Sequence, residues 1–550
     1  MSRRFAMEVA TLSVVMGFTV FAFAGEPASS AASAAVPQEQ RPIAVGPKDM
    51  ARLGTVDERF QSYNVEMIEL TGGRYWKPYD AQSAAAAQEQ PEPSAGEDED
   101  IGPSWSTDPR IFSYRQPTDL DNARLRMLAA ALGPAYVRVS GICANATYFA
   151  DSDSAPATPP KGFSCVLPRQ RWKEMIDFAR AVDGKIITSF AVSTGVRDSK
   201  GVWSPGQARS LIDYTRSIGG EIAAVEFMNE PTASAVIKAP FYDAMAYGRD
   251  FKIFRNLIRQ TDPEIKVMGP GTVGWRIPHF NPGNVPGVFA SLDMLAAMKP
   301  AKVDVFSYHD YGAASLRCAE AGLPQTSAAE ALSEAWLSST DNTLALYRMV
   351  RDRFESDAPI WISESADAAC GGNPWASTFL DTFRYLDQRG RLARQGVQVI
   401  MHNTLAASDY GLLDNTTFEP RPNYWAALLW HRLMDNRVLD AGVPSRGGLH
   451  LYAHCLKGTS GGVALLAINT NTEKAQTLAL PVEAQRYTLA SASGDLQSRS
   501  VLLNGNVLQL GSGDELPALE GVGVEAGDIR LEPATITFLA LPGATNQACR

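Results

Sequence analysis

Short apolar runs recur through the middle of the chain and alternate with amphipathic stretches of helical period. Several of the runs are apolar over four or more consecutive residues, which is typical of parallel strands buried on both faces. Eight runs have the composition expected of strands: Tyr63–Leu70, Ala135–Ser140, Lys185–Val192, Ala223–Glu230, Lys266–Gly269, Val303–Tyr311, Pro359–Ser365 and Val397–Asn403.

Helical patterns lie between many of these runs. Asp119–Leu132 places leucines on one stripe, with Thr118 as a candidate N-cap and Gly133-Pro134 as the stop. Arg169–Val182 shows a second such pattern and ends before Asp183-Gly184. Eight strands with intervening helices over about 350 residues predict an α/β fold, a (β/α)8 or TIM barrel with insertions.

The pattern changes after about Asn436. Short alternating runs such as Gly462–Ile468, Tyr487–Ala492 and Ile536–Leu541 are separated by Gly, Asn and Ser, which is typical of an antiparallel β-sandwich. We therefore expect the barrel over residues 46–435 and a β-sandwich domain over residues 436–550. The segment before the first barrel strand is expected to add a strand to the sandwich.

The N-terminus resembles a targeting signal. Arg3 and Arg4 precede an apolar stretch over Val9–Phe23, which ends in Ala22-Phe23-Ala24. A basic start, an apolar core and an A-x-A-like site predict a signal peptide over residues 1–24. The alternative, an uncleaved anchor, is disfavoured because a membrane span needs roughly 20 apolar residues. We expect an exported protein, periplasmic or secreted, without a stable membrane anchor after cleavage.

Two low-complexity segments and the overall charge narrow the possible partners. Residues 25–45 are rich in Ala, Ser, Pro and Gln and predict a disordered leader, and residues 80–100 form an acidic insert. The chain has 50 Lys+Arg against 60 Asp+Glu, a net charge of −10. This balance argues against nucleic acid as a partner, because phosphates require a basic surface.

Six cysteines become candidates for disulfides if the protein is exported. Sequence alone leaves 15 connectivities open, and reduced buried cysteines are the alternative. Cys143 and Cys165 flank a Ser/Pro/Asp-rich stretch, which suggests the pair Cys143–Cys165. Cys318 and Cys370 each follow a predicted barrel strand and suggest the pair Cys318–Cys370, and the pair Cys455–Cys549 would tie the C-terminus to the terminal domain.

Two predicted strands carry glutamates where the active site of a TIM barrel is expected, at the carboxyl ends of the strands. Glu230 lies in Phe-Met-Asn-Glu-Pro at the end of the fourth strand, and Glu364 lies in Trp-Ile-Ser-Glu-Ser at the end of the seventh. Either residue alone could simply pair with an arginine. Two carboxylates at matching strand ends are what hydrolysis of a glycosidic bond requires, because one donates a proton and the other attacks the sugar or activates water.

Around these two motifs the chain resembles glycoside hydrolase family 79, which contains β-glucuronidases and heparanase. The similarity extends through Arg124–Arg138, Ser210–Pro231, Cys370–Val397, Asp409–Asp414 and Pro422–Trp425, and so covers most of the barrel. The resemblance implies that Glu230 is the general acid/base and Glu364 the nucleophile of a retaining mechanism. Their carboxyl groups should then lie about 5–5.5 Å apart, in environments that push their pKa values apart.

The resemblance also implies a set of sugar-binding residues. Asn229 is the expected partner of the sugar 2-hydroxyl, and Gly371 and Gly372, with Tyr410, are expected to hold a uronate carboxylate through backbone N–H groups. Cys370 stands just before these glycines, where the family often has another glycine. The other candidates lie at ends of the first, sixth and eighth strands: Glu66, Tyr308, His309, Tyr311 and Asn403. Which of the three sixth-strand residues points inward is left open.

Neither a cofactor nor a metal is expected. The chain has no His-Glu-x-x-His motif and no P-loop. Lysine-rich segments and a processed linker, which heparanase has, are also missing, and Val192–Asp198 carries a single arginine. These departures favour an exo-β-glucuronidase acting on small glucuronides or glycan ends. The alternatives are an endo-β-glucuronidase of heparanase type on glycosaminoglycans, and a catalytically inactive carbohydrate-binding relative.

Overall fold

A computed structural model describes residues 41–79, 108–231, 242–274, 291–443 and 448–550. The predicted signal peptide, most of the predicted leader and the acidic insert 80–100 lie outside the described residues. The last residues of the predicted leader belong to a sheet, because β1 (Ile43–Ala44) pairs with β18 (Gln476–Leu480).

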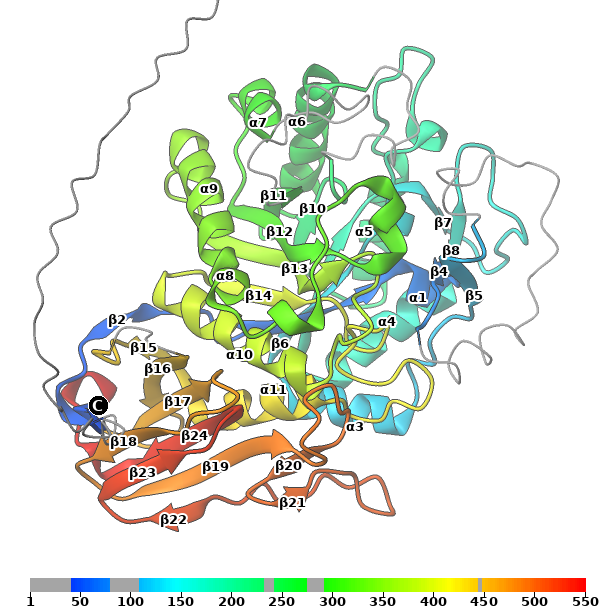
Figure 1. Cartoon of the computed structure of the whole chain (residues 1–550). Helices are drawn as coiled ribbons and strands as arrows, with labels where there is room; N and C mark the ends of the chain where they lie inside the picture. The colour runs from blue at the N-terminus through cyan, green and yellow to red at the C-terminus, as the bar shows by residue number, and fades with distance from the viewer. Residues whose placement is uncertain (1–40, 80–107, 232–241, 275–290, 444–447) are drawn as a thin grey trace, which may run out of the picture. The chain divides into compact units, whose positions relative to one another are not determined.

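The predicted barrel is confirmed. Its strands are parallel to their neighbours and close in chain order, and Figure 1 shows helices surrounding them. They are β3 (Gln61–Glu66), β6 (Ala135–Ser140), β9 (Gly184–Ser189), β10 (Ile222–Glu226), β11 (Lys266–Gly274), β12 (Val305–Ala314), β13 (Ile360–Ala369) and β14 (Val399–His402). Each predicted run contains one of these strands or overlaps it.

The helices lie largely between the strands, as expected of βα units. The longer ones are α3 (Ala123–Ala131), α4 (Arg169–Ala181), α5 (Gly206–Ser217), α6 (Ala244–Thr261), α7 (Ser291–Met298), α9 (Ser339–Phe354), α10 (Phe379–Arg394) and α11 (Pro422–Leu433). Two short helices, α1 (Met67–Thr71) and α8 (Glu334–Leu337), follow β3 and precede α9.

Three details of the prediction were wrong. The first strand ends at Glu66, because the Glu69 carboxylate accepts the Glu66 N–H at 2.8 Å and the chain turns into α1. The N-cap of α3 is Asn122, whose side chain accepts the N–H of Leu125, and Thr118 is not the cap. The fourth strand ends at Glu226, four residues before the end of its predicted run.

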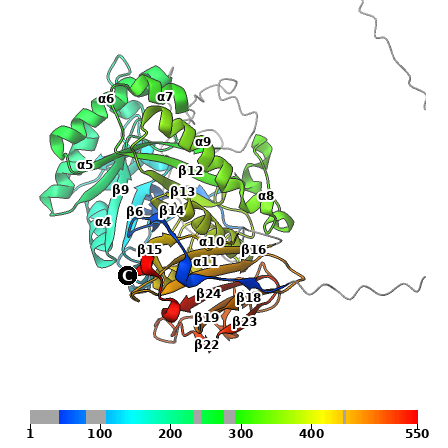
Figure 2. The ribbon, with the colours of Figure 1, turned by 90° about the vertical axis from the view of Figure 1, so that its left-hand side faces the viewer.

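The C-terminal region forms two sheets in the described chain. The larger has nine strands, in the order β2-β15-β16-β17-β24-β19-β20-β21, with β22 on β19, and the smaller has the order β1-β18-β23. Leu451, Leu465, Leu478, Ile529 and Leu539 belong to one buried cluster contributed by both sheets. Figure 2 shows the strands from β15 to β24 together, in yellow to red.

The bounds of these strands show where the N-terminus contributes. β2 (Arg52–Thr55) pairs antiparallel with β15 (Met434–Leu439), so the segment before the barrel adds a strand to this region, as predicted. The others are β16 (Leu449–Leu456), β17 (Val463–Asn469), β19 (Ala484–Ser491), β20 (Val501–Leu503), β21 (Asn506–Val507), β22 (Val522–Val524), β23 (Gly527–Leu531) and β24 (Thr535–Leu541).

The cysteines are paired as the sequence suggested. Disulfides join Cys143 to Cys165, Cys318 to Cys370 and Cys455 to Cys549. The second of these links the segments that follow β12 and β13, two adjacent barrel strands. Among the described residues, no helix is both long and apolar enough to cross a membrane.

A buried carboxylate connects α10 to the larger C-terminal sheet. Asp387 on α10 accepts hydrogen bonds from the Tyr452 hydroxyl and pairs with His450, both on β16, and Arg391 donates to it at 2.6 Å. Nε2 of His450 also lies 3.0 Å from Glu334. Burial lowers the pKa of His450, but the Asp387 carboxylate outweighs burial and the net shift is upward.

This contact predicts a pH-dependent contribution to stability. Because the pKa of His450 is raised in the folded state, its contribution is complete below the ordinary histidine pKa of about 6.5 and is lost as pH rises through the folded value. We expect His450→Gln to lower the free energy of unfolding by about 1–3 kcal/mol at pH 5.5 and by less at pH 9. Urea unfolding of both proteins across this range measures the difference, and a constant difference would contradict the assignment.

Candidate active site

The structure brings the two predicted carboxylates together through a histidine. Glu364 lies within β13, and Glu230 lies four residues after β10. Nδ1 of His309 is 2.9 Å from Glu230 Oε1 and 3.4 Å from Glu364 Oε2. One oxygen of each carboxylate lies within 4.8 Å of the other. A sugar C1–O bond placed between them could therefore be reached from both sides.

Glu364 is held as an anion. Arg138 donates to Glu364 Oε1 at 2.7 Å, and the Tyr311 hydroxyl donates to Oε2 at 2.6 Å. Burial raises the pKa of Glu364, but the charges of His309 and Arg138, with these hydrogen bonds, outweigh burial and lower it. The carboxylate is thus ionised at neutral pH, as a nucleophile requires.

Arg138 is a site residue that the sequence analysis missed. It lies on β6 with its side chain 1% exposed and binds Glu226 Oε2 through Nε at 2.9 Å and Nη2 at 2.7 Å. It also donates to Asn229 Oδ1 at 2.9 Å. An arginine inside an otherwise apolar strand is the signal that could have revealed it, because a buried guanidinium requires acidic partners.

Arg138 should be essential for stability as well as for activity. We expect Arg138→Met to lower the free energy of unfolding by about 3–5 kcal/mol, because Glu226 and Glu364 would remain buried without their cation. Chemical denaturation of the two proteins at pH 7 measures this loss. The double variant with Glu226→Gln should recover part of it, and a single variant as stable as wild type would contradict the role of Arg138 as counter-ion.

The segment carrying Glu230 is held by a side chain rather than by a neighbouring strand. Asn145 accepts the Asn229 N–H at 2.8 Å and donates to the Asn229 carbonyl at 2.9 Å. Glu230 then takes a φ of 47°, an uncommon conformation for a residue with a side chain. Its side chain is 16% exposed and turned to His309. The Asn229 Nδ2 group has no hydrogen-bond partner among the described residues, so it is available to a sugar hydroxyl.

The structure distinguishes the three candidates on the sixth strand. His309 and Tyr311 both touch Glu364, whereas the Tyr308 ring stacks on Tyr347 with centroids 4.3 Å apart. Tyr308 is therefore not at the carboxylates, because successive side chains of a strand point to opposite faces. Burial lowers the pKa of His309, but Glu364 and Glu230 outweigh burial and raise it.

The remaining candidates at the strand ends form one polar network. Asn403 Nδ2 donates to the hydroxyls of Tyr311 at 2.9 Å and Tyr410 at 3.0 Å. Glu66 is buried, and burial, then repulsion by Glu364, raise its pKa well above its ordinary value. Tyr75, on β4 (Gly73–Trp76), was missed: its hydroxyl lies 3.3 Å from that of Tyr410. β4 pairs with β5 (Phe112–Arg115) in an insertion after the first barrel strand. The sequence of this insertion contains no motif that marks Tyr75 as a site residue.

The glycine loop after β13 presents a backbone donor. Cys370, Gly371 and Gly372 have φ values of 62°, 82° and 84°, a region that favours glycine. The carbonyls of Gly371 and Gly372 accept bonds from Asp409 N at 3.2 Å and Arg317 Nη1 at 2.9 Å. The buried Gly371 N–H has no partner among the described residues, although more than about 90% of buried backbone groups are paired. It is therefore a candidate anion donor.

Glu230, His309 and Glu364 also have a spacing that a metal ion could use, the one such group in the described part of the chain. The Arg138 guanidinium already lies 2.7 Å from Glu364 and supplies positive charge there. These three residues are therefore better suited to acid/base and nucleophilic catalysis by the two carboxylates than to binding a metal ion.

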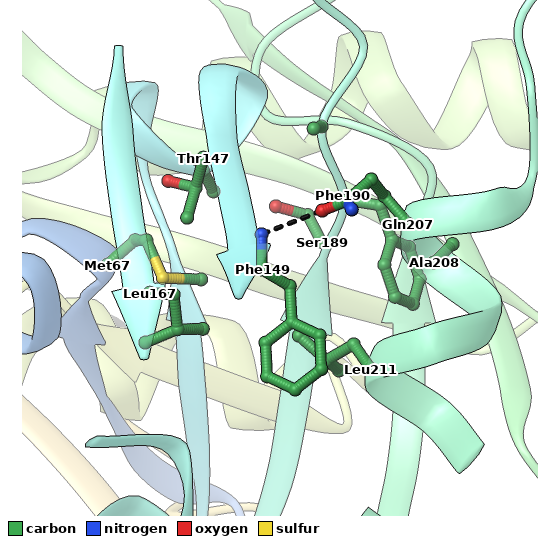
Figure 3. Close-up of a pocket in the computed structure, with 11 residues that line it drawn as sticks. Met67, Thr147, Phe149, Leu167, Ser189, Phe190, Gln207, Ala208 and Leu211 are labelled. Atoms are coloured by element: carbon green, nitrogen blue, oxygen red, sulfur yellow. Dashed lines mark hydrogen bonds between the residues drawn. The ribbon is translucent and has the colours of Figure 1, made fainter. Parts of the chain in front are cut away.

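A separate cavity lies beside the barrel and is shown in Figure 3. Its walls include Met67, Phe149, Leu167 and Leu211, and Gln207 accepts the Phe149 N–H at 2.7 Å. None of the candidate carboxylates lines it. Its mostly apolar walls carry no groups suited to catalysis.

Comparisons with known proteins find similarity to glycoside hydrolases. The model of the glycosyl hydrolase family 79 N-terminal domain matches residues 158–390, a range that contains Glu230 and Glu364. Heparanase-like protein 1 of Arabidopsis thaliana is 27% identical over 426 residues, 70% of this chain and 76% of the relative. Baicalin-beta-D-glucuronidase of Scutellaria baicalensis is 34% identical over 195 residues, 34% of this chain and 37% of the relative. The structure of an alpha-L-arabinofuranosidase from Thermotoga maritima superposes with a TM-score of 0.59 at 14% identity, covering 91% and 99% of the two chains, which supports the fold alone.

Proposed function

Because the chain belongs to glycosyl hydrolase family 79, we propose that it is a retaining β-glucuronidase that releases terminal β-linked glucuronic acid. The observation that carries this proposal is the short distance between the Glu230 and Glu364 carboxylates, within 4.8 Å between oxygens. A retaining enzyme has its carboxyl groups about 5–5.5 Å apart, whereas an inverting enzyme leaves room for water at about 6.5–9.5 Å.

Glu364 attacks the anomeric carbon and forms a covalent glycosyl ester while Glu230 gives its proton to the leaving oxygen. Once the ester forms, Glu364 has lost its negative charge, and Glu230 takes a proton from the water that hydrolyses the ester. Arg138 and Tyr311 donate to the Glu364 carboxylate and so hold it for attack. His309 lies 2.9 Å from Glu230 and 3.4 Å from Glu364, so it is placed to hold both carboxylates in position.

Three observations support a glucuronide as the substrate. The Gly371 N–H is a buried donor without a partner in the described chain, and Tyr410 lies in the network that reaches Tyr311. Backbone amides can bind a carboxylate without a nearby lysine or arginine. A relative in the same family is named a beta-D-glucuronidase.

Exo action on small glucuronides or glycan ends is favoured over endo action on glycosaminoglycans. The chain carries a net charge of −10, which repels a sulfated polymer. The relative named a heparanase-like protein keeps endo action as the second candidate. The presence of both glutamates at one site argues against the third alternative, a catalytically inactive carbohydrate-binding protein, because such a protein would not need them.

The same proposal includes export and a supporting domain. The N-terminal pattern of residues 1–24 suggests secretion, and three disulfides suit an oxidising compartment. We interpret the two C-terminal sheets as a β-sandwich that supports the barrel through contacts such as Asp387 with Tyr452.

The proposal is tested by release of p-nitrophenol from the β-glucuronide, with the β-glucoside and β-galactoside as controls. We expect hydrolysis of the glucuronide alone. If the protein cleaves heparan or hyaluronan oligomers but does not cleave p-nitrophenyl β-glucuronide, it is an endo-β-glucuronidase. Inertness toward all of these substrates, with binding intact, would favour the carbohydrate-binding alternative.

A further inference from the structure

A buried arginine outside the catalytic pair joins several loops at the mouth of the barrel. Arg317 lies in the short helical segment Leu316–Ala321 after β12, with its side chain 4% exposed. Its Nη1 donates to the carbonyls of Cys370 at 3.2 Å and Gly372 at 2.9 Å. Nε donates to the Lys77 carbonyl at 2.9 Å, and Nη2 binds Asp409.

Arg317 binds the glycine loop, residues 370–372, through the backbone carbonyls of the loop. The peptide between Cys370 and Gly371 has its carbonyl on Arg317 and on the Ser315 hydroxyl, at 2.8 Å. In a trans peptide the N–H points away from the carbonyl, so the Gly371 N–H is directed away from Arg317. That N–H is the buried donor without a partner in the described chain.

A second peptide of the loop depends on Arg317 through Asp409. The carbonyl of Gly371 accepts the backbone N–H of Asp409 at 3.2 Å, and the Asp409 carboxylate is bound by Arg317. The Gly372 N–H belongs to this peptide, so its direction is fixed from the same side. The cation on the Cys370 carbonyl also polarises the peptide that carries the Gly371 N–H and strengthens that N–H as a donor.

We propose that Arg317 is a positioning residue that makes the site selective for a uronate over the corresponding neutral sugar. It does so without touching the substrate, by aiming the N–H groups of Gly371 and Gly372 and by polarising that of Gly371. This inference rests on the proposed glucuronidase function. Because Asp409 neutralises much of the arginine's charge, the effect is local orientation rather than long-range attraction of anions.

The neighbouring covalent link makes this role testable. Cys318 follows Arg317 directly and is bonded to Cys370, so the two segments stay joined when the arginine is replaced. Gly371 itself cannot be varied cleanly, because a Cβ there would lie 2.6 Å from Trp76 Cβ. Arg317→Gln removes the cation, and Arg317→Lys keeps a cation without the planar fork that serves two carbonyls at once.

The matched control is Arg499→Gln. Arg499 reaches the same Asp409 carboxylate at 3.9 Å with its side chain 37% exposed, and no hydrogen bond joins it to the glycine loop in the described chain. The assays are kcat and KM on the p-nitrophenyl β-glucuronide and β-glucoside. Inhibition constants for free glucuronic acid and glucose provide a measure that does not need turnover of the glucoside.

We expect Arg317→Gln to lower kcat/KM for the glucuronide by about 10- to 100-fold and to raise the inhibition constant of glucuronic acid by a similar factor. The values for glucoside and glucose should change by less than about threefold, the lysine variant should be intermediate, and Arg499→Gln should match wild type. Equal losses on charged and neutral ligands, or an unchanged preference in folded Arg317→Lys, would overturn this inference alone. A wild-type enzyme that neither cleaves the glucuronide nor binds glucuronic acid would overturn the proposed function and this inference with it.

Discussion

Replacement of Glu364 by glutamine should lower kcat on p-nitrophenyl β-glucuronide by about ten-thousandfold or more, because an amide cannot form the glycosyl ester. The substitution preserves shape and leaves Arg138 and Tyr311 in place. Circular dichroism and the thermal midpoint establish that the variant is folded, and steady-state kinetics with single-turnover measurements establish the loss.

The control for this variant is Glu355→Gln. Glu355 is a buried glutamate at the C-terminus of α9. It lies before the first residue of β13, whereas Glu364 lies within that strand. Its replacement should leave kcat and KM close to those of wild type. A Glu364→Gln enzyme with more than about one tenth of wild-type kcat would remove Glu364 from the nucleophile role.

Replacement of Glu230 by alanine should lower activity by an amount that depends on the leaving group. Loss of a general acid/base costs about 100- to 10,000-fold, and an alkyl glucuronide needs the proton more than the p-nitrophenyl glucuronide does. The first step on the nitrophenyl substrate should therefore survive best. Azide can replace activated water in the second step, so it should accelerate this variant and yield a β-glucuronyl azide.

The result that would contradict this role is an equal loss on both leaving groups with no effect of azide. His309→Asn is an informative companion variant, because it removes the imidazole 2.9 Å from Glu230 and keeps the glutamate. It should weaken catalysis on both substrates without an azide product.

The barrel could be predicted because its signal is repeated and local. Each strand is a short apolar run bounded by polar residues, and Ala135–Ser140 agrees residue for residue with β6. The ends of strands were less predictable. Phe227 and Met228 continue the apolar pattern of β10, yet the strand ends at Glu226. Asn145 binds the Asn229 backbone there, and that contact spans 84 residues of sequence.

The proximity of Glu230 and Glu364 could be predicted because the order of the strands places both residues at the same end of one barrel. The position of Tyr308 could also have been predicted from the two-residue repeat of a strand. Along β12 the side chains of His309 and Tyr311 lie on the face opposite to that of Tyr308. The role of Arg317 could not be predicted from the sequence, because its partners are backbone carbonyls of other loops. No sequence motif identifies a residue that acts through backbone groups.

The stereochemistry of the first product tests the central claim most directly. Proton NMR during the initial turnover of p-nitrophenyl β-glucuronide should show β-glucuronic acid first, with the α-anomer appearing only by mutarotation. That order is required if Glu364 forms a covalent intermediate and Glu230 activates water on the same face. Initial release of the α-anomer would contradict the double displacement, and the two glutamates would then have to act on a water molecule between them.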